Sequence, residues 1–200
     1  MTTPSPFKGA SNIIPQINNM QFDVILATTD KGGIGRDGIL PWRFSEYLRR
    51  FKSITCHTET LSKRNAVIMG RKTYFSIPEK DRPLKGRINI VLTNNMEEVS
   101  GELDGRVITA SSFEEALLCA FRRPNIESVF VIGGLSLYTT ALNDKRCRKI
   151  HLTKIHANTI CNVFVPEIPS ILSGNSSFGY NLCYKEIINE SQEFHLYQRA

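Results

Sequence analysis

Short apolar runs alternate along this chain with segments whose apolar residues recur at helical spacing. The runs are rich in valine, isoleucine and phenylalanine, which is typical of buried β-strands. The predicted strands are Phe22–Thr28, Asn65–Met69, Arg87–Thr93, Arg106–Thr109, Ile126–Ile132 and Lys149–Ile155.

The segments between these strands predict helices. Ser112 is a typical helix cap, and Glu114 and Glu115 suit the positive end of the helix that follows it. Strands that alternate with helices favour an α/β fold, an open and mostly parallel sheet covered on both faces. The predicted helices are Phe44–Thr55, a short segment from Gly70 that stops before Pro78, a segment from Ser112 to about Arg122, and Leu135–Leu142.

The two ends of the chain differ from this alternation. Strand-like runs at Leu182–Ile188 and Glu193–Gln198 follow a loop around residues 173–179 with no helix between them. They predict an antiparallel hairpin at the end of the sheet. Residues 1–20 are rich in Pro, Asn and Ser and lack the apolar block of a signal peptide, so we expect an extended N-terminal arm and one domain over residues 21–200.

Composition narrows the possible partners. The net charge is +6 and the pI is about 9.1, but the basic residues are dispersed, which disfavours nucleic acid. A small anionic ligand accounts for the excess of positive charge equally well. The five cysteines include no C-x-x-C pair, so we expect no metal site and a reducing, cytoplasmic location. No apolar run is long enough for a membrane span.

Two segments follow the pattern of strand, glycine turn and helix: Val67–Thr73 and Val129–Tyr138. A helix N-terminus offers unpaired N–H groups to a phosphate, and Arg71 and Lys72 add positive charge at the first turn. Neither segment matches a standard nucleotide motif, and glycines also serve simply to permit tight turns. The residues alone therefore predict an α/β protein that binds a phosphorylated small molecule.

Several segments, in order and spacing, resemble the dihydrofolate reductase family, in particular its eukaryotic and protist members. The resemblance covers about residue 21 to the C-terminus. It implies an eight-stranded, mostly parallel sheet with an antiparallel C-terminal hairpin and about four helices. The segments are Gly33–Gly35 through Leu40–Trp42, Val67–Thr73 with Ser76–Pro78, Arg82–Arg87, Val131–Tyr138, Leu152–Thr153 and Val163–Glu167.

The resemblance also implies an activity, the reduction of 7,8-dihydrofolate to tetrahydrofolate by NADPH. Gly33–Trp42 would be a mobile flap over the nicotinamide, and Arg71 would carry most of the preference for NADPH because Asn94 stands where many relatives have a basic residue. The residues implied to bind NADPH are Ala27, Ile34, Gly35, Gly38, Leu40, Gly70, Arg71, Lys72, Thr73, Leu92, Thr93, Asn94, Ile132, Gly133, Gly134, Leu135, Ser136, Leu137 and Tyr138.

The same resemblance implies a folate site, at which antifolates would also bind. Arg87 would pair with the α-carboxylate of the glutamate tail, and Thr153 would orient the acid that holds the pteridine. Without the resemblance, the apolar members of this set would be read as core and Arg87 as a surface charge. The implied contacts are Ile25, Ala27, Tyr47, Leu48, Phe51, Ile77, Leu84, Arg87, Ile132 and Thr153, with Leu40, Trp42, Tyr47 and Thr153 at the reacting centre.

One departure from the family affects the chemistry. The family has Asp or Glu four residues before the channel Phe, and here that position is Tyr47 if Phe51 is the channel Phe. A phenol neither carries a charge near neutral pH nor accepts two hydrogen bonds as a carboxylate does. Glu46 is the candidate substitute, but it lies off the apolar helical stripe and suits an ion pair with Arg49 or Arg50.

Three functions therefore remain open. The first is a working dihydrofolate reductase that uses Glu46, water or Tyr47. The second is a weak or inactive relative that serves as a ligand-binding or scaffold module. The third and least favoured is a reductase of the same fold that acts on another pterin-like substrate, because Arg82–Arg87 matches the folate version in full. Association or fusion with thymidylate synthase, as in many protist members, is a further open expectation.

Overall fold

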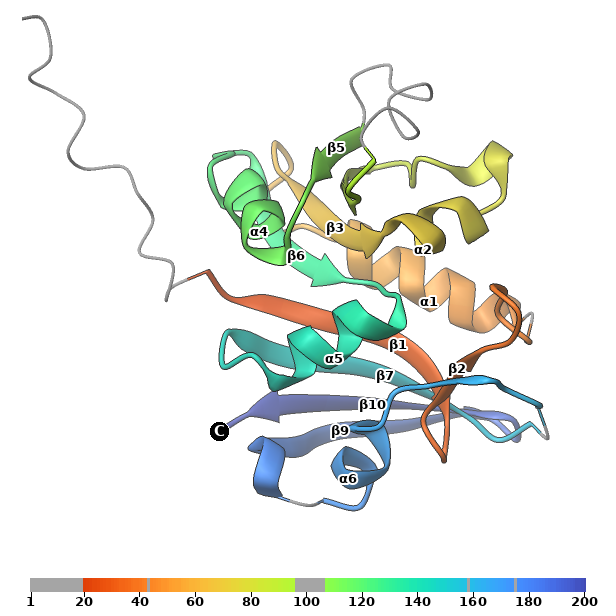
Figure 1. Ribbon diagram of the computed structural model, residues 1–200. Helices are drawn as coiled ribbons and strands as arrows, with labels where there is room; N and C mark the ends of the chain where they lie inside the picture. The colour runs from red at the N-terminus through yellow and green to blue at the C-terminus, as the bar shows by residue number, and fades with distance from the viewer. Residues whose placement is uncertain (1–19, 43, 96–106, 158, 175) are drawn as a thin grey trace, which may run out of the picture.

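The computed structural model describes residues 20–200 apart from residues 43, 96–106, 158 and 175, and it contains an eight-stranded twisted sheet (Figure 1). All neighbouring strands are parallel except β10, which is antiparallel to both of its neighbours. The predicted sheet and its C-terminal hairpin are therefore confirmed. In spatial order the strands are β5 (Val107–Ala110), β4 (Arg87–Leu92), β3 (Arg64–Gly70), β6 (Ile126–Val131), β1 (Phe22–Thr29), β7 (Cys147–Ile155), β10 (Gln192–Arg199) and β9 (Tyr180–Asn189).

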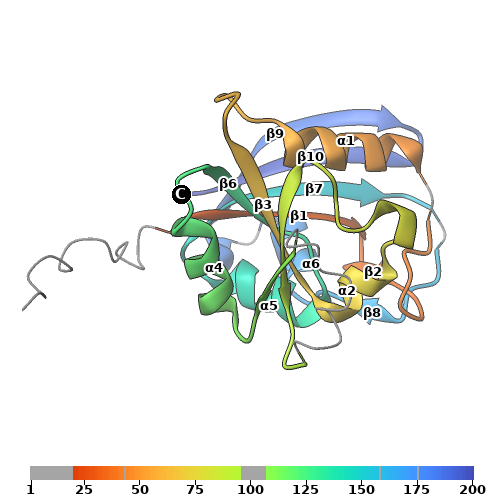
Figure 2. The ribbon, with the colours of Figure 1, turned by 90° about the horizontal axis from the view of Figure 1, so that it is seen from above.

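The helices lie on both faces of this sheet, with α1 on one side and α4 and α5 on the other (Figure 2). Four of them occupy the predicted segments, and Ser112 caps α4 by accepting a hydrogen bond from the Glu115 amide. A fifth short helix, α6, was not predicted. None of the described helices is long and apolar enough to cross a membrane. The helices are α1 (Ser45–Cys56), α2 (Arg71–Ser76), α4 (Phe113–Phe121), α5 (Leu135–Asn143) and α6 (Ile168–Leu172), and two 3₁₀ turns span Glu79–Asp81 and Ser176–Phe178.

Alternate residues of β1 face two different cores, because successive side chains of a strand point to opposite faces. Phe22, Val24 and Leu26 pack beneath α4, α5 and α6 in the larger core. Ile25 packs among the side chains of α1 and α2, and Ala27 lies next to Tyr47 at the start of α1. The first core holds the molecule together, and the second lies along the face that carries the predicted site.

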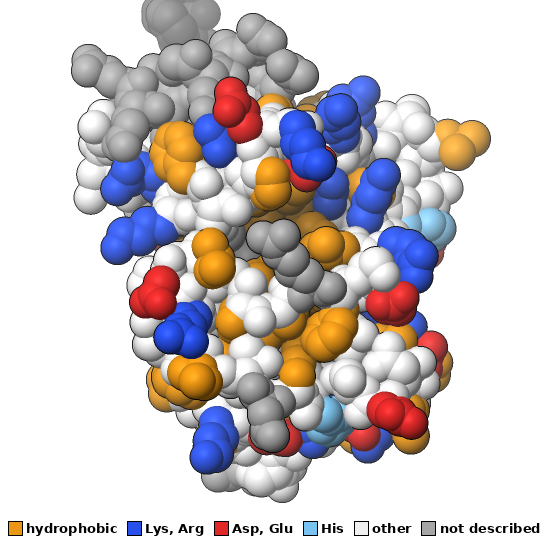
Figure 3. Space-filling view, turned by 90° about the vertical axis from the view of Figure 1, so that its right-hand side faces the viewer, with side chains coloured by type: hydrophobic (Ala, Val, Ile, Leu, Met, Phe, Trp, Pro, Cys, Tyr) orange, Lys and Arg blue, Asp and Glu red, His pale blue; other side chains and the backbone are white. Residues whose placement is uncertain are grey.

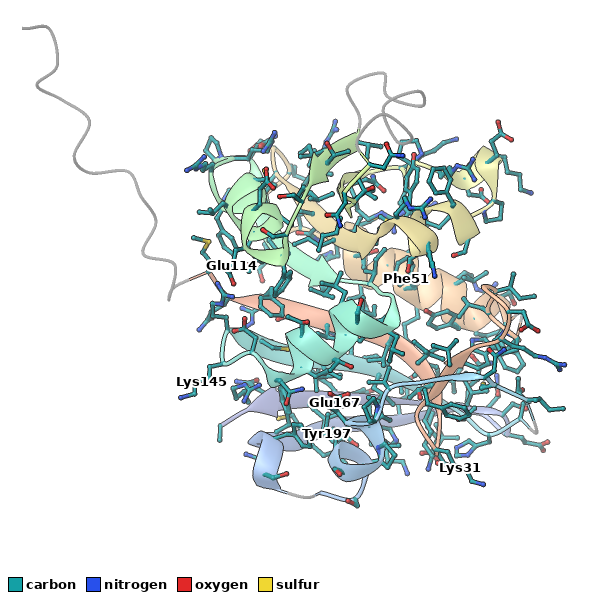
Figure 4. All side chains as sticks on the ribbon, viewed as in Figure 1. Lys31, Phe51, Glu114, Lys145, Glu167 and Tyr197 are labelled. Atoms are coloured by element: carbon teal, nitrogen blue, oxygen red, sulfur yellow. The ribbon has the colours of Figure 1, made fainter. Side chains whose placement is uncertain are left out.

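Two sets of contacts outside the main sheet hold loop segments in place. Strands β2 (Gly33–Gly35) and β8 (Val163–Phe164) pair with each other, which ties the glycine-rich loop to a segment some 130 residues later. Glu167, at the start of α6, accepts hydrogen bonds from Asn143 and Thr139 of α5 (Figure 4). Neither connection was predicted, because both depend on contacts between distant parts of the chain.

The predicted N-terminal arm falls mainly on residues 1–19, which lie outside the described part of the chain. Met20 is described, and its side chain is buried in the larger core together with Phe22. The folded part of the chain therefore begins at least one residue earlier than the predicted boundary at residue 21.

Asn65 joins α1 to the middle of the sheet. Its buried amide donates to the Thr55 and His57 carbonyls at 3.1 and 2.7 Å and accepts from the Ser128 amide at 3.0 Å. These three bonds link the end of α1 to β3 and β6. Asn65 thus anchors the far end of the helix that carries Tyr47.

We expect Asn65→Ala to lower the free energy of unfolding by about 2–4 kcal/mol, because it leaves buried backbone groups without partners. Urea denaturation followed by circular dichroism measures this loss. Asn181→Ala on the exposed strand β9 is the matched control and should change stability by less than about 0.5 kcal/mol. Equal stability of the two variants would show that Asn65 does not anchor α1.

Candidate functional site

The two predicted glycine turns lie side by side at the carboxyl ends of the neighbouring strands β3 and β6. The Gly70 amide donates to the Gly133 carbonyl at 2.8 Å. A Cβ on Gly134 would lie 3.2 Å from the Thr73 hydroxyl, so the turns approach as closely as glycine allows. Gly133 also has φ +123°, a conformation that side chains disfavour. The structure thus brings together two segments some 60 residues apart in the sequence.

Helix α5 begins at this junction and presents its N-terminal amides there. Its N-cap is Gly134, and no side chain caps the helix, so its first N–H groups remain available to an anion. Ser136 and Leu135 are exposed at this end, whereas Leu137 and Tyr138 are buried in the larger core. The last two therefore hold α5 on the sheet, and their contact with NADPH stays a prediction.

A pocket of about 520 Å³ opens beside the first turn. Arg71 reaches it from α2, and Leu92, Thr93 and Asn94 line it from the end of β4, as the sequence predicts. Lys72, also predicted here, is exposed and does not line the pocket.

Asn95 and Ser111 complete the pocket and were missed by the sequence reasoning. Local pattern does not reveal their position, because the loops after β4 and β5 meet only through the pairing of these two strands. The Thr93 hydroxyl donates to the Asn95 carbonyl and accepts from the Asn95 amide, both at 3.0 Å. These bonds shape the loop into a polar wall.

On the other side of β1, Tyr47 lies at the centre of a small apolar cluster. The buried members are Ala27, Trp42, Tyr47 and Ile155, with Phe44, Phe51, Ala157 and Cys161 packed around them. Thr153 is buried on β7 and pairs in register with Ala27. The hydroxyl of Tyr138 donates to the Ile25 carbonyl at 3.0 Å and so connects α5 with the same part of β1.

The Tyr47 phenol is neutral in these surroundings. Only 8% of the residue is exposed, and burial raises the pKa of its hydroxyl to about 12. In the same cluster, the buried Trp42 indole N–H has no hydrogen-bond partner among the described residues. The cluster therefore contains one buried donor that a water or a ligand group entering it would satisfy.

The structure does not bring Glu46 to this cluster. Its carboxylate accepts hydrogen bonds from the Ser45 hydroxyl and the Arg49 guanidinium, both at 3.0 Å. Its own backbone N–H and the Ser45 hydroxyl hold the pKa of Glu46 below its usual value. The substitution of Glu46 for the missing acid thus lacks a structural basis, because one residue along a helix turns the side chain by about 100°.

Arg87 closes the far end of α1. It is 8% exposed, donates to the Thr55 hydroxyl at 2.8 Å and to the Lys85 carbonyl at 3.1 Å, and lies over the Phe51 ring. Desolvation by burial lowers the pKa of its guanidinium. Within the described ranges no carboxylate pairs with Arg87. A buried cation without an anionic partner is the arrangement that a carboxylate ligand would complete.

Between Arg87 and Tyr47 the predicted channel residues are only partly covered. Phe51, Ile77 and Leu84 pack against the second core and keep part of their surface open. Leu48, which was predicted to share an apolar face of α1 with Phe51, is 52% exposed. Figure 3 shows apolar side chains gathered in a hollow on the face that contains this end of the molecule, with Lys and Arg prominent around its upper part.

The predicted flap, residues 33–42, borders the same face. Gly33 lies so close to Cys161 that a Cβ would come within 2.7 Å of its sulfur. Asp37 and Asn162 are joined by two hydrogen bonds. The Asp37 backbone amide donates to Asn162 Oδ1 at 3.1 Å, and Asn162 Nδ2 donates to the Asp37 carboxylate at 2.7 Å. Leu40 is 44% exposed at the tip of this loop, near the open Gly38. Ile34 and Gly35 are partly covered, and Ile132 is buried at the end of β6.

Comparison with known proteins identifies the relatives of this chain. The family model described as dihydrofolate reductase matches residues 21–173. The bifunctional dihydrofolate reductase-thymidylate synthase 1 of Arabidopsis thaliana is 46% identical over 154 residues, 74% of this chain and 29% of the relative. The dihydrofolate reductase of Aedes albopictus is 40% identical over 153 residues, 75% of this chain and 81% of the relative. The dihydrofolate reductase of Drosophila melanogaster is 37% identical over 150 residues, 75% of this chain and 81% of the relative.

These relatives differ in length. The matched region spans 29–30% of the bifunctional proteins from Arabidopsis thaliana and Glycine max, and about four fifths of the insect proteins. It begins with β1 and includes both glycine turns, the flap and Arg87.

Because burial raises the pKa of Tyr47 to about 12, this phenol stays protonated in the folded state when the unfolded state has already ionised near pH 10. Its contribution to stability is present below pH 10 and is lost between pH 10 and 12. Between pH 10 and 12 we expect the free energy of unfolding of Tyr47→Phe to fall by up to about 2–3 kcal/mol less than that of the unchanged chain. Urea unfolding at several pH values from 9 to 12 measures it.

The control for this titration is Tyr184→Phe, on an exposed strand. It should leave the alkaline slope of stability as it is in the unchanged chain. If both variants had the slope of the unchanged chain, Tyr47 would not be buried as a neutral phenol.

Proposed function

This chain belongs to the dihydrofolate reductase family, and from this premise we propose that it reduces 7,8-dihydrofolate to 5,6,7,8-tetrahydrofolate with NADPH. The observation that carries the proposal is the junction of Gly70 with Gly133 between a polar pocket and an apolar cluster. Such a junction lets a dinucleotide and a flat heterocycle lie side by side.

The residues present fit NADPH. Gly70, Gly133 and Gly134 present backbone without side chains at the junction, where the first amides of α5 would bind a pyrophosphate. Arg71 and Thr93 line the adjacent pocket, where a 2′-phosphate would lie. When bound, NADPH supplies the hydride. We propose that the flap around Leu40 excludes water from the site of this transfer.

The residues present also fit a folate. We propose that Ala27, Phe51 and Leu84 contact the heterocycle and its aryl group in the apolar hollow. Arg87 would pair with the α-carboxylate of the glutamate tail, which compensates the buried positive charge. The reaction also needs a proton at N5 of the pterin. Tyr47 holds its own proton too tightly to supply it readily, because the pKa of this phenol is raised to about 12. The N5 proton then comes from solvent.

We expect Tyr47→Asp to raise the rate of hydride transfer by about 10²–10⁴-fold, because a carboxylate beside the pterin favours its protonated form. Single-turnover stopped-flow measurement of NADPH oxidation reports this rate, and the affinity for NADPH should stay within about twofold. Glu46→Gln is the matched control and should leave turnover unchanged. No gain in Tyr47→Asp would mean that Tyr47 does not occupy the acid position.

We expect Arg87→Leu to weaken the binding of dihydrofolate by about 30-fold or more, because the tail carboxylate loses its charged partner. Binding of a dihydropterin without the glutamate tail should change less than threefold. Equilibrium titration of both ligands separates loss of the tail contact from a general loss of structure. Equal weakening of both ligands would count against this role of Arg87.

Two further proposals concern the setting of the enzyme. All five cysteines are free thiols, which supports a reducing, cytoplasmic location. Bifunctional relatives support association with a thymidylate synthase, as a partner or a fused domain. The alternative of an inactive binding module gains no support from the relatives. A spectrophotometric NADPH oxidation assay with dihydrofolate decides between activity and inactivity.

A further inference from the structure

The heterocycle end of the proposed folate site is built without a negative charge. The side chains that surround Tyr47 are Ala27, Trp42 and Ile155, with Phe44, Phe51, Ala157 and Cys161 packed around them, and none of these is a carboxylate. The nearest acidic residue in sequence, Glu46, is paired with Arg49 outside the cluster. At the other end of the hollow, Arg87 carries an uncompensated positive charge.

The polar groups that do face this space suit a neutral ligand. The Trp42 indole N–H is buried without a partner in the described part of the chain and can donate one hydrogen bond. The Tyr47 phenol, in the same cluster, can donate one and accept others. A neutral 2-amino-4-oxo heterocycle offers both donors and acceptors along one edge, so these groups can satisfy it. A protonated heterocycle would instead bring a charge into an apolar cluster with no counter-ion, which costs several kcal/mol.

We infer that Tyr47 makes this site selective for neutral heterocycles, so that protonated 2,4-diaminopyrimidines and 2,4-diaminopteridines are bound poorly. The inference rests on the proposed function, because it assumes that the hollow beside Tyr47 receives the heterocycle. Tyr47 is thereby a residue that determines ligand specificity, in addition to its effect on proton supply. The neutral heterocycle of folate and the protonated diamino heterocycle differ by one positive charge, and the uncharged Tyr47 side chain does not balance that charge.

The test uses the full chain saturated with NADPH and the fluorescence of Trp42, the single tryptophan of the sequence. Folate and a 2,4-diaminopyrimidine are titrated at pH values from 5.5 to 9. We expect the affinity for the diaminopyrimidine to rise with pH as this ligand loses its proton, and the affinity for folate to change less than threefold. The opposite trend, tightest binding of the protonated diaminopyrimidine, would overturn the inference.

Two variants separate charge from size. Tyr47→Asp introduces a carboxylate, and Tyr47→Asn introduces a side chain of the same size without charge. We expect Tyr47→Asp to bind the protonated diaminopyrimidine about 100-fold more tightly than Tyr47→Asn does, the range seen when a buried charge gains its partner. Equal affinities in the two variants would mean that Tyr47 acts by its bulk, and would overturn the inference.

The outcomes also distinguish this inference from the proposed function. If folate binds but the diaminopyrimidine binds the unchanged chain most tightly in its protonated form, only the inference fails. If neither ligand changes the Trp42 fluorescence or competes with the other in equilibrium dialysis, the folate site is absent and both fail. Rising diaminopyrimidine affinity with pH, together with the gain in Tyr47→Asp over Tyr47→Asn, supports both.

Discussion

The hydrogen bond from the Gly70 amide to the Gly133 carbonyl is the contact on which the arrangement of the site depends. It continues the pairing of β3 and β6 for one step beyond the strands, into the two turns. Side chains at Gly133 and Gly134 would meet Thr73 or Tyr138 at 3.2–3.4 Å, so glycine sets how closely the turns approach. Through this contact, the polar pocket near Arg71 and the apolar cluster near Tyr47 come to lie on either side of one junction.

The rest of the fold keeps this junction in place through the division of β1 between two cores. Leu26 faces the helices that bury the back of the sheet, and Ala27, the next residue, faces Tyr47. The larger core includes α5, so the helix whose first amides face the junction is fixed by deeply buried contacts such as Leu142. The smaller core is closed by α1 and α2, and Asn65 holds the far end of α1. One face of β1 therefore contributes mainly to stability, and the opposite face lies along the candidate ligand site.

The sequence predicted the parts of the structure that depend on local pattern. Apolar runs located the eight strands of the main sheet to within a few residues, and the two glycine turns indicated a shared phosphate site. Helical spacing correctly put Tyr47 on the inward face of α1 and Glu46 on the outward one. The same spacing overestimated the stripe at Leu48, which is half exposed because α1 has no neighbouring helix on that side.

The parts that could not be predicted depend on pairings across long stretches of chain. The exchange between Asp37 and Asn162 spans 125 residues, and the β2–β8 pair that surrounds it involves strands of only two or three residues. Such short segments carry no periodicity. Asn95 and Ser111 line the pocket only because β4 and β5 are adjacent in the sheet. Topology therefore has to be known before these residues can be assigned.

The presence of Tyr47 has an energetic consequence that a carboxylate would not have. An ionised side chain among Ala27, Trp42 and Ile155 would be desolvated before any ligand arrived, and the folded chain would lose stability for that reason. A neutral phenol avoids this penalty and adds aromatic contact with Phe51. The gain in stability is obtained where the chemistry prefers a charge, so stability and catalytic power oppose each other at this position. This chain has the uncharged, stabilising residue at position 47. The lack of a charge there determines which ligands fit the site.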